Sequence, residues 1–123
     1  MASVRVLAVG LAGALGALAR YGLGVAVGVR SFPWATLGIN LAGCFLLALL
    51  LAGPAAERWS PTTNVALAVG FLGAFTTFST FGYETLTLLR TDRAVSAVGY
   101  VAGSVAGGLA CAALGYVAGR ALR

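Results

Sequence analysis

The sequence predicts an all-α membrane protein of four transmembrane helices, with a broken third helix, that assembles as an antiparallel dual-topology homodimer. Three observations lead to this class. The 123 residues are 60% hydrophobic and 9% charged, which is the composition of a membrane protein. Hydroxyl side chains gather inside the third apolar stretch, and the arginines divide almost evenly between the helix ends. We expect residues 1–123 to form one transmembrane domain, multi-pass in the cell (inner) membrane.

Four apolar stretches have the length of about 20 residues that a spanning helix needs. They cover residues 4–29, 34–52, 62–89 and 94–118. The connections between them hold proline, glycine and charged residues, which favour turns. Trp34 and Trp59 stand at helix ends, where aromatic side chains anchor a span at the membrane interface. The first stretch is too long for the apolar core of a secretory signal, so we expect it to remain as a helix.

The third stretch contains the run Thr76-Thr77-Phe78-Ser79-Thr80-Phe81, with four hydroxyls and two phenyl rings. Serine and threonine bond back to the main chain, and Gly70 and Gly73 weaken the helix ahead of them. The pattern predicts a broken helix at membrane depth. Irregular backbone is tolerated there only where it is buried in protein or lines a wet cavity. The run is therefore the first place to look for an ion or substrate.

The arginines at the helix ends form two sets of nearly equal size. One end holds Arg5, Arg58, Arg120 and Arg123, and the other holds Arg30, Arg90 and Arg93. Because the positive-inside rule orients a chain by its arginine and lysine asymmetry, this balance predicts insertion both ways. Two opposite copies would pair about a two-fold axis in the membrane plane. We assign the net charge of +5 to lipid head groups rather than to nucleic acid.

Small side chains recur at four-residue steps in the last stretch, with a cysteine in the one missing place: Gly99, Gly103, Gly107, Cys111, Gly115 and Gly119. Such a ribbon lets helices approach closely. It fits packing within one copy and packing between copies equally well. Cys44 and Cys111 both lie inside spans, where cysteine behaves as a small apolar residue, so we expect neither a disulfide nor a metal site from them.

Two polar residues lie well inside the first and second stretches. Arg20 is ten residues before Arg30, which places it about 15 Å from that helix end. A charge at that depth faces a cavity or a partner, unless its long side chain reaches the interface. Asn40 continues a helical stripe from Thr36. Its amide either bonds to another helix or faces a pore.

Phe75, Phe78 and Phe81 recur at three-residue steps, and the default interpretation of such a stripe is core packing. The neighbouring hydroxyls add a second interpretation. A phenyl ring has a positive edge, so these rings can line the route of an anion without binding it tightly, as conduction requires. Glu84 follows one turn later. Its carboxylate either pairs with an arginine near the helix end or belongs to a vestibule.

Three motifs carry a resemblance to a known family. They are Gly13-Ala-Leu-Gly16-Ala-Leu-Ala-Arg20-Tyr21, Thr36-Leu-Gly-Ile-Asn40-Leu-Ala-Gly43-Cys-Phe45 and Gly70-Phe-Leu-Gly73-Ala-Phe-Thr76-Thr77-Phe78-Ser79-Thr80-Phe81. The chain resembles the fluoride channels of the Fluc/CrcB family over essentially its whole length. The third motif is highly specific, and all three occur in the right order on the right helices.

The resemblance implies a passive fluoride channel, not an enzyme, that exports cytoplasmic fluoride and lowers its toxicity. It implies a dual-topology homodimer in the lipid bilayer, with two antiparallel pathways built from residues of both copies. It also implies a structural Na⁺ on the two-fold axis, held by backbone carbonyls that map to Gly73 and Thr76. An unwound stretch is what frees carbonyls for a hard cation at that depth.

Individual residues acquire roles from the same resemblance. Phe78 and Phe81 would be the rings along the ion path, and Asn40 a donor beside them. The other positions that the resemblance places on the path are Ser79 and Thr80 in a hydroxyl track, Arg20 towards a vestibule, and Tyr100 and Ser104 in the fourth helix. Donors of this kind replace the water that fluoride loses on entering a narrow path.

Two other classes of membrane protein remain as alternatives. Small multidrug or guanidinium exporters are also four-helix, dual-topology proteins, but they resemble one another in using a glutamate of the first helix for cations, where this chain has Arg20. A purely structural subunit of a larger complex would have no use for a charge and hydroxyls inside the membrane. The sequence has neither a nucleotide-binding loop nor a carboxylate in the first helix, so no residue suggests energy coupling. This favours a passive channel.

Overall fold

The computed structural model describes residues 1–123 and contains helices but no strands. Its elements are α1 (Ala2–Val27), α2 (Trp34–Ala52), α3 (Ala55–Arg58), α4 (Pro61–Val65), the π-helical segment η1 (Ala66–Leu72), α5 (Gly73–Phe75), α6 (Phe78–Arg90) and α7 (Ala94–Ala121). Four helical stretches are long and apolar enough to cross a membrane: α1, α2, α7 and the run Pro61–Arg90 that comprises α4 to α6. Their ends lie within three residues of the expected spans.

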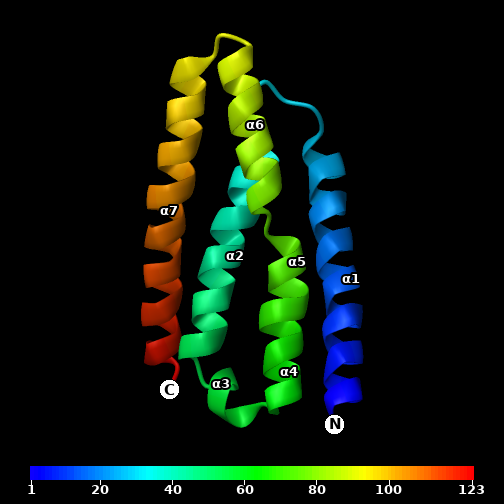
Figure 1. The fold of residues 1–123 in the computed structure, drawn as a ribbon. Coiled ribbons are helices and arrows are strands. Elements are labelled where there is room, and N and C mark those ends of the chain that lie inside the picture. The colour runs from blue at the N-terminus through cyan, green and yellow to red at the C-terminus, as the bar shows by residue number, and fades with distance from the viewer.

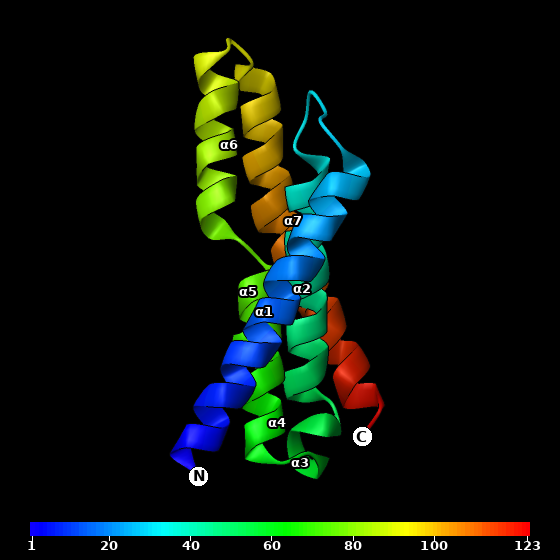
Figure 2. The same cartoon turned by 90° about the vertical axis from the view of Figure 1, so that its right-hand side faces the viewer.

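The four spans lie side by side as two packed pairs (Figure 1). α2 packs mainly along α7, whereas α1 packs along η1 and α5. α6 leaves the line of α4 and α5 and leans on the first half of α7, as the turned view in Figure 2 shows. Both termini and α3 lie at one end of the bundle, and the connections α1–α2 and α6–α7 lie at the other end. The two arginine sets therefore occupy opposite ends of the molecule.

Glycines create the closest approach between each pair of helices. A Cβ atom on Gly16 of α1 would overlap the backbone carbonyl of Phe71, and one on Gly115 of α7 would overlap the carbonyl of Phe45. Helix axes that are this close leave no room for a side chain at the contact. The packing of both pairs therefore depends on glycine at a specific position.

The predicted ribbon of small residues divides into two parts. Near the end of α7, a Cβ on Gly119 would lie 2.9 Å from the nitrogen of Gly53, so this part packs within the chain. Gly99 and Gly103 have no other atom within 4 Å of an added Cβ. The first part of the ribbon therefore has no partner inside this chain.

The third span departs from α-helical geometry in two places, the π-helical segment η1 and the extended residues Thr76 and Thr77. α4 begins at Pro61, after Ser60 whose hydroxyl accepts a bond of 3.1 Å from the Thr63 N–H, a normal helix N-cap. Between α5 and α6 the backbone is extended, with ψ of 157° at Thr76 and 118° at Thr77. The Thr77 hydroxyl then accepts from the Thr80 N–H at 3.3 Å and caps α6. Hydroxyls thus start both helical parts of this span.

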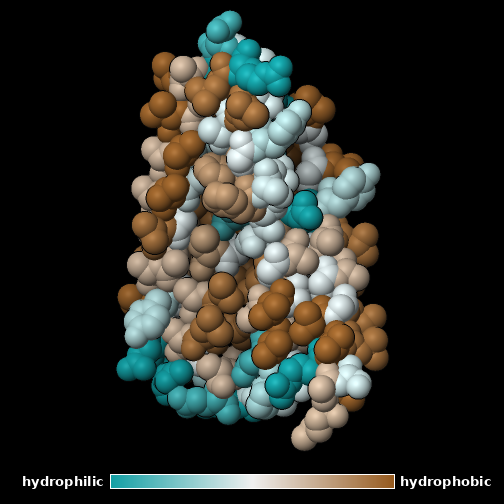
Figure 3. Space-filling model, in the orientation of Figure 1, coloured by the Kyte–Doolittle hydropathy of each residue, from teal (hydrophilic) through white to brown (hydrophobic).

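The surface of the bundle is suited to lipid around its middle. Only 15 of 123 residues are buried within the chain, and most large apolar side chains of the spans are exposed. Figure 3 shows hydrophobic residues over the middle of the molecule and hydrophilic residues gathered at both ends. In hydrocarbon this surface needs no further burial. The polar side chains inside the bundle form the candidate site.

Candidate functional site

Asn40 of α2 binds the interruption of the third span through both polar atoms of its side chain. Its Nδ2 donates to the Thr77 carbonyl at 2.9 Å, and its Oδ1 accepts from the Thr77 N–H at 2.8 Å. An extended residue inside a span would otherwise leave both backbone groups unpaired, which is costly in hydrocarbon. Of the two interpretations of Asn40, the structure shows the bond to another helix. One hydrogen of the amide remains for a further partner.

Arg20 of α1 reaches the other side of the interruption. Its Nε donates to the Ala74 carbonyl at 3.1 Å, and the side chain is half-buried. Ala74 lies in the last turn of α5, where carbonyls lack a helical partner because the helix ends. Arg20 also lines a cavity of about 700 Å³ together with Thr36, Thr77 and Glu84. The guanidinium is thus held at the interruption rather than extended to the membrane interface.

The phenylalanine stripe is divided by the interruption. Phe75 is 7% exposed and packs against Phe71 at a centroid distance of 5.9 Å. Phe78 and Phe81 lie 5.7 Å apart, and Phe81 makes an edge contact of 5.1 Å with the Tyr100 ring. Phe78 is 82% exposed. Core packing is therefore correct for Phe75, whereas the two later rings form a line from the surface of the chain to Tyr100.

Glu84 has no arginine partner, so of its two possible roles the structure does not show the ion pair. Its two carboxylate oxygens accept from the Thr36 hydroxyl at 2.8 Å and from the Tyr100 hydroxyl at 3.0 Å. Thr36 is 7% exposed and Tyr100 is fully buried. Hydroxyls of α2 and α7 face the carboxylate directly, whereas the arginines of this end bond to backbone carbonyls: Arg30 to Val27 and Arg93 to Ser31. The carboxylate of α6 thereby connects three spans.

The remaining predicted residues are less closely associated. Thr80 accepts from the Thr77 hydroxyl at 3.0 Å and lines the 700 Å³ cavity. Ser79 is exposed and makes no side-chain hydrogen bond within the chain. The Ser104 hydroxyl is buried without a partner, one turn after Tyr100. A buried hydroxyl normally has a partner, so Ser104 has unused bonding capacity one turn from Tyr100.

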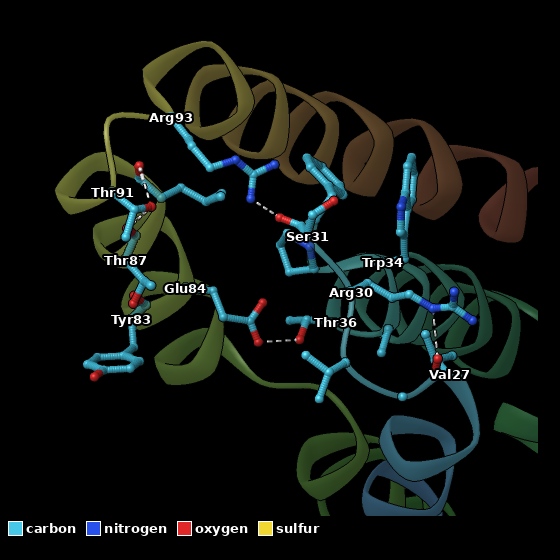
Figure 4. Close-up of a pocket in the computed structure, with 16 residues that line it drawn as sticks. Val27, Arg30, Ser31, Trp34, Thr36, Tyr83, Glu84, Thr87, Thr91 and Arg93 are labelled. Atoms are coloured by element: carbon cyan, nitrogen blue, oxygen red, sulfur yellow. Dashed lines mark hydrogen bonds between the residues drawn. The ribbon is translucent and has the colours of Figure 1, made fainter.

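Three hollows adjoin one another along this polar line. The first, of about 280 Å³, is lined by Asn40, Gly73, Thr76, Thr77 and Phe78 among others. It shares Thr77 with the 700 Å³ cavity. That cavity shares Thr36 and Glu84 with a third hollow of about 450 Å³ at the α1–α2 loop. Figure 4 shows this third hollow, with Glu84 and Thr36 pointing toward one another and Arg93 reaching Ser31 on its far side.

Sequence reasoning identified most of these residue types but missed their pairings. Thr36 was expected only as part of a stripe, yet it is a direct partner of Glu84. The available signal was a hydroxyl one turn before Asn40 on the same helical face. Nothing in the sequence indicated that Arg20 would bond to the Ala74 carbonyl. That pairing depends on how α1 crosses the third span.

The fold and the site define a multi-pass membrane protein, with four helices long and apolar enough to cross the bilayer and a line of polar hollows between them. A family model described as CrcB-like protein, Camphor Resistance (CrcB), matches residues 7–116. The chain belongs to this CrcB-like family.

Curated relatives match nearly the full length of the chain. The fluoride-specific ion channel FluC of Thermus thermophilus is 47% identical over 121 residues, covering 96% of this chain and 97% of the relative. FluC 2 of Rhodococcus jostii is 49% identical over 112 residues, covering 90% and 95%. FluC 1 of Bacillus thuringiensis is 47% identical over 115 residues, covering 90% and 84%. All three are named fluoride-specific ion channels.

Proposed function

We propose that this protein is a fluoride-selective passive channel that exports cytoplasmic fluoride and thereby lowers its toxicity. The observation that carries the proposal is identity of 45–49% to fluoride-specific channels across at least 90% of the chain. A channel needs no catalytic group, and the polar side chains here are of the kind that bind and release ions. A multidrug or guanidinium exporter would use a glutamate of the first helix. This chain has Arg20 there, and its Nε donates to the Ala74 carbonyl at the interruption.

The proposed ion path begins at the hollow beside Asn40 and Phe78 and passes Phe81 towards Tyr100. Fluoride is small and strongly hydrated, so a narrow path must offer donors that replace its water. The free amide hydrogen of Asn40, the ring edges of Phe78 and Phe81, and the hydroxyl of Thr80 supply such donors near the interruption. Tyr100 and Ser104 continue the path along α7, Ser79 lies at its exposed edge, and Arg20 adds positive charge in the 700 Å³ cavity. These contacts are individually weak, which permits rapid release.

We propose that two copies of opposite orientation form the working assembly, with their interrupted third spans in contact at the centre of the bilayer. Phe78 and Ser79 are exposed on the single chain directly beside the interruption. An added Cβ on Gly99 or Gly103 would also meet no other atom of the chain within 4 Å. A second copy would cover such features and give each path residues from both chains. Nearly equal arginine sets at the two ends permit both orientations.

A structural Na⁺ at the contact between the two interruptions fits the backbone there. The Thr76 carbonyl, which lies outside any helix, accepts no hydrogen bond, and Gly73 lies just before it at the start of the short helix α5. Both residues line the 280 Å³ hollow. Oxygen ligands suit a hard cation, and two carbonyls from each copy would supply four. When bound, the ion would neutralise these carbonyl dipoles and hold the two copies together.

Efflux from liposomes tests the proposed function. Purified protein is reconstituted into liposomes loaded with potassium fluoride or potassium chloride, and release is followed with ion-selective electrodes after addition of valinomycin. We expect fast fluoride release and chloride release at the rate of protein-free liposomes. Equal release of both halides would contradict fluoride selectivity. Proton-coupled uptake of guanidinium would instead support the exporter.

A further inference from the structure

The interruption of the third span exposes more backbone groups than its own residues can pair. The Thr76 N–H donates to the Leu72 carbonyl at 3.1 Å, and the Thr77 hydroxyl accepts from the Thr80 N–H. That leaves at least the carbonyls of Ala74, Thr76 and Thr77 and the N–H of Thr77 without a partner inside the segment. Each unpaired group in a membrane interior costs several kcal/mol. The interruption is therefore stable only if neighbouring spans supply the missing partners.

Two side chains from two different spans supply partners for these groups, except for the Thr76 carbonyl. Arg20 of α1 donates to the Ala74 carbonyl at 3.1 Å. Asn40 of α2 donates to the Thr77 carbonyl at 2.9 Å and accepts from the Thr77 N–H at 2.8 Å. These three bonds lie on either side of Phe75 and Thr76, and none of them uses the carbonyl of Gly73 or of Thr76. The pairing therefore uses the carbonyls of Ala74 and Thr77 and spares those of Gly73 and Thr76, two of the residues that line the 280 Å³ hollow.

We propose that Arg20 and Asn40 are positioning residues that together hold the interruption in its extended form, and that Arg20 acts chiefly through its Nε–H bond rather than through its charge. A helix that re-formed across Thr76 and Thr77 would consume the spared carbonyls in ordinary helical bonds. α1 and α2 prevent this by fixing Ala74 and Thr77 separately. The inference rests on the proposed function only for its transport readout.

The chemistry of the two side chains permits variants that separate these roles. In glutamine the side-chain nitrogen is the same number of bonds from Cα as Nε of arginine, so Arg20→Gln keeps a donor and removes the charge. Lysine keeps the charge but places a methylene at that position, so Arg20→Lys removes the donor there. Asn40→Leu has nearly the same shape and loses both bonds to Thr77, whereas Asn40→Asp keeps only the acceptor for the Thr77 N–H.

Hydrogen–deuterium exchange of the segment 72–82 in nanodiscs measures the interruption directly, because local opening controls amide exchange. We expect Arg20→Lys to exchange about tenfold faster there than the unmodified protein, the factor that corresponds to one ordinary hydrogen bond, and Asn40→Leu to exchange faster still, because it loses two bonds. Arg20→Gln should stay close to the unmodified protein, and Asn40→Asp should fall between. The matched control is Arg30→Lys, because the Arg30 Nε also donates to a carbonyl, that of Val27 at 3.0 Å, but in an exposed loop.

Fluoride efflux from liposomes supplies the second readout. In the positioning role, Arg20→Lys loses more flux than Arg20→Gln; in a purely electrostatic role the order is reversed. Equal protection of segment 72–82 in all Arg20 and Asn40 variants would overturn the inference while leaving the channel proposal intact. If the unmodified protein releases no fluoride, the channel proposal fails, and the exchange measurement still decides whether Arg20 and Asn40 hold the interruption.

Discussion

Glu84 places a carboxylate inside the third span, where both of its oxygens accept hydrogen bonds from other spans. A carboxylate inside a membrane span is costly unless its oxygens are well bonded, and here each oxygen accepts from a buried hydroxyl, one on Thr36 and one on Tyr100. These bonds to a charged acceptor are stronger than those between neutral groups. The three side chains therefore connect α2, α6 and α7 at a single point.

Replacing Glu84 by Gln tests this connection. The amide has one acceptor oxygen instead of two, so one of the two hydroxyls loses its acceptor. We expect Glu84→Gln to lower the free energy of unfolding by about 1–3 kcal/mol. Thermal unfolding in detergent measures it, and Tyr100→Phe is the matched variant that removes one bond from the other side. If the double variant is as destabilised as the sum of the two single variants, the two residues are not coupled.

Phe78 and Phe81 differ in surroundings although both belong to the proposed path. Replacing either ring by Ile nearly keeps the volume but removes the positive edge. We expect fluoride flux in liposomes to fall by up to about tenfold in each variant, since contacts to an aromatic ring edge are worth about 0.5–1.5 kcal/mol. Phe81→Ile should also lower thermal stability, because Phe81 contacts Tyr100 at 5.1 Å, whereas Phe78→Ile should not, because Phe78 is 82% exposed on the single chain.

A normal elution volume of the dimer in size-exclusion chromatography is the condition for interpreting both ring variants. Tyr116→Ile, which removes an exposed ring on α7 away from the hollows, serves as the control and should conduct normally. Unchanged flux in both Phe78→Ile and Phe81→Ile would return these rings to ordinary packing.

At the residue level the sequence indicates which side chains are polar inside a span, but not what they bind. Asn40 was open to two roles, and the structure shows both atoms on Thr77. For Glu84, an ion pair with an arginine near the helix end and a vestibule role were both open, and the structure shows no arginine partner. Its actual partners come from positions 48 and 16 residues away in sequence. Such pairings depend on how helices cross, which side-chain periodicity alone does not specify.

Helix pairs in this bundle are held by glycines at defined positions, so single methyl groups should separate two kinds of glycine. An added Cβ on Gly115 would overlap the Phe45 carbonyl, whereas one on Gly103 meets nothing within 4 Å. We expect Gly115→Ala to lower the free energy of unfolding by about 1–3 kcal/mol, the usual range for overpacking. Thermal unfolding in detergent measures this change.

Gly103→Ala is the matched control and also settles where the open part of the ribbon packs. If this part faces lipid, the substitution should leave stability the same or raise it by less than about 1 kcal/mol, because alanine favours helix. If it contacts a second copy, Gly103→Ala should instead weaken dimerisation in a dilution series while monomer unfolding is unchanged. Equal destabilisation by both substitutions would contradict the packing described for α2 and α7.

The helices themselves were largely predictable because each span is a long apolar stretch bounded by turn residues. α2 begins and ends at the expected residues, Trp34 and Ala52. The π-helical geometry of η1 (Ala66–Leu72) was not foreseen, since no residue pattern distinguishes it from an α-helix in an apolar run. The extended residues were easier to anticipate, because threonines at 76 and 77 offer hydroxyls that compete with helical bonding.

The whole molecule carries its charge at its two ends. Arg5, Arg58, Arg120 and Arg123 lie near the termini and α3, where Arg123 also pairs with Glu57 at 2.8 Å. Arg30, Arg90 and Arg93 lie at the opposite end. Because the two sets differ by one arginine, removing one or two charges should be enough to impose an orientation. That sensitivity gives a direct test of dual topology.

Two opposite charge variants provide the test. Arg58→Gln with Arg123→Gln leaves two arginines at one end against three at the other, whereas Arg90→Gln leaves two against four in the opposite sense. A membrane-impermeant thiol reagent applied to cells carrying Ala2→Cys should label about half of the copies in the balanced protein, and should label nearly all copies in one charge variant and few in the other. Cys44 and Cys111 lie within spans and contribute little background.

Co-expression connects orientation to function. If the working assembly needs two opposite copies, each charge variant alone should protect cells poorly against fluoride, because nearly all of its copies face the same way. Expressing the two variants together should restore protection, since each supplies the orientation that the other lacks. Full protection by either variant alone, with labelling from one side only, would show that copies of one orientation suffice and would remove the antiparallel dimer from the proposal.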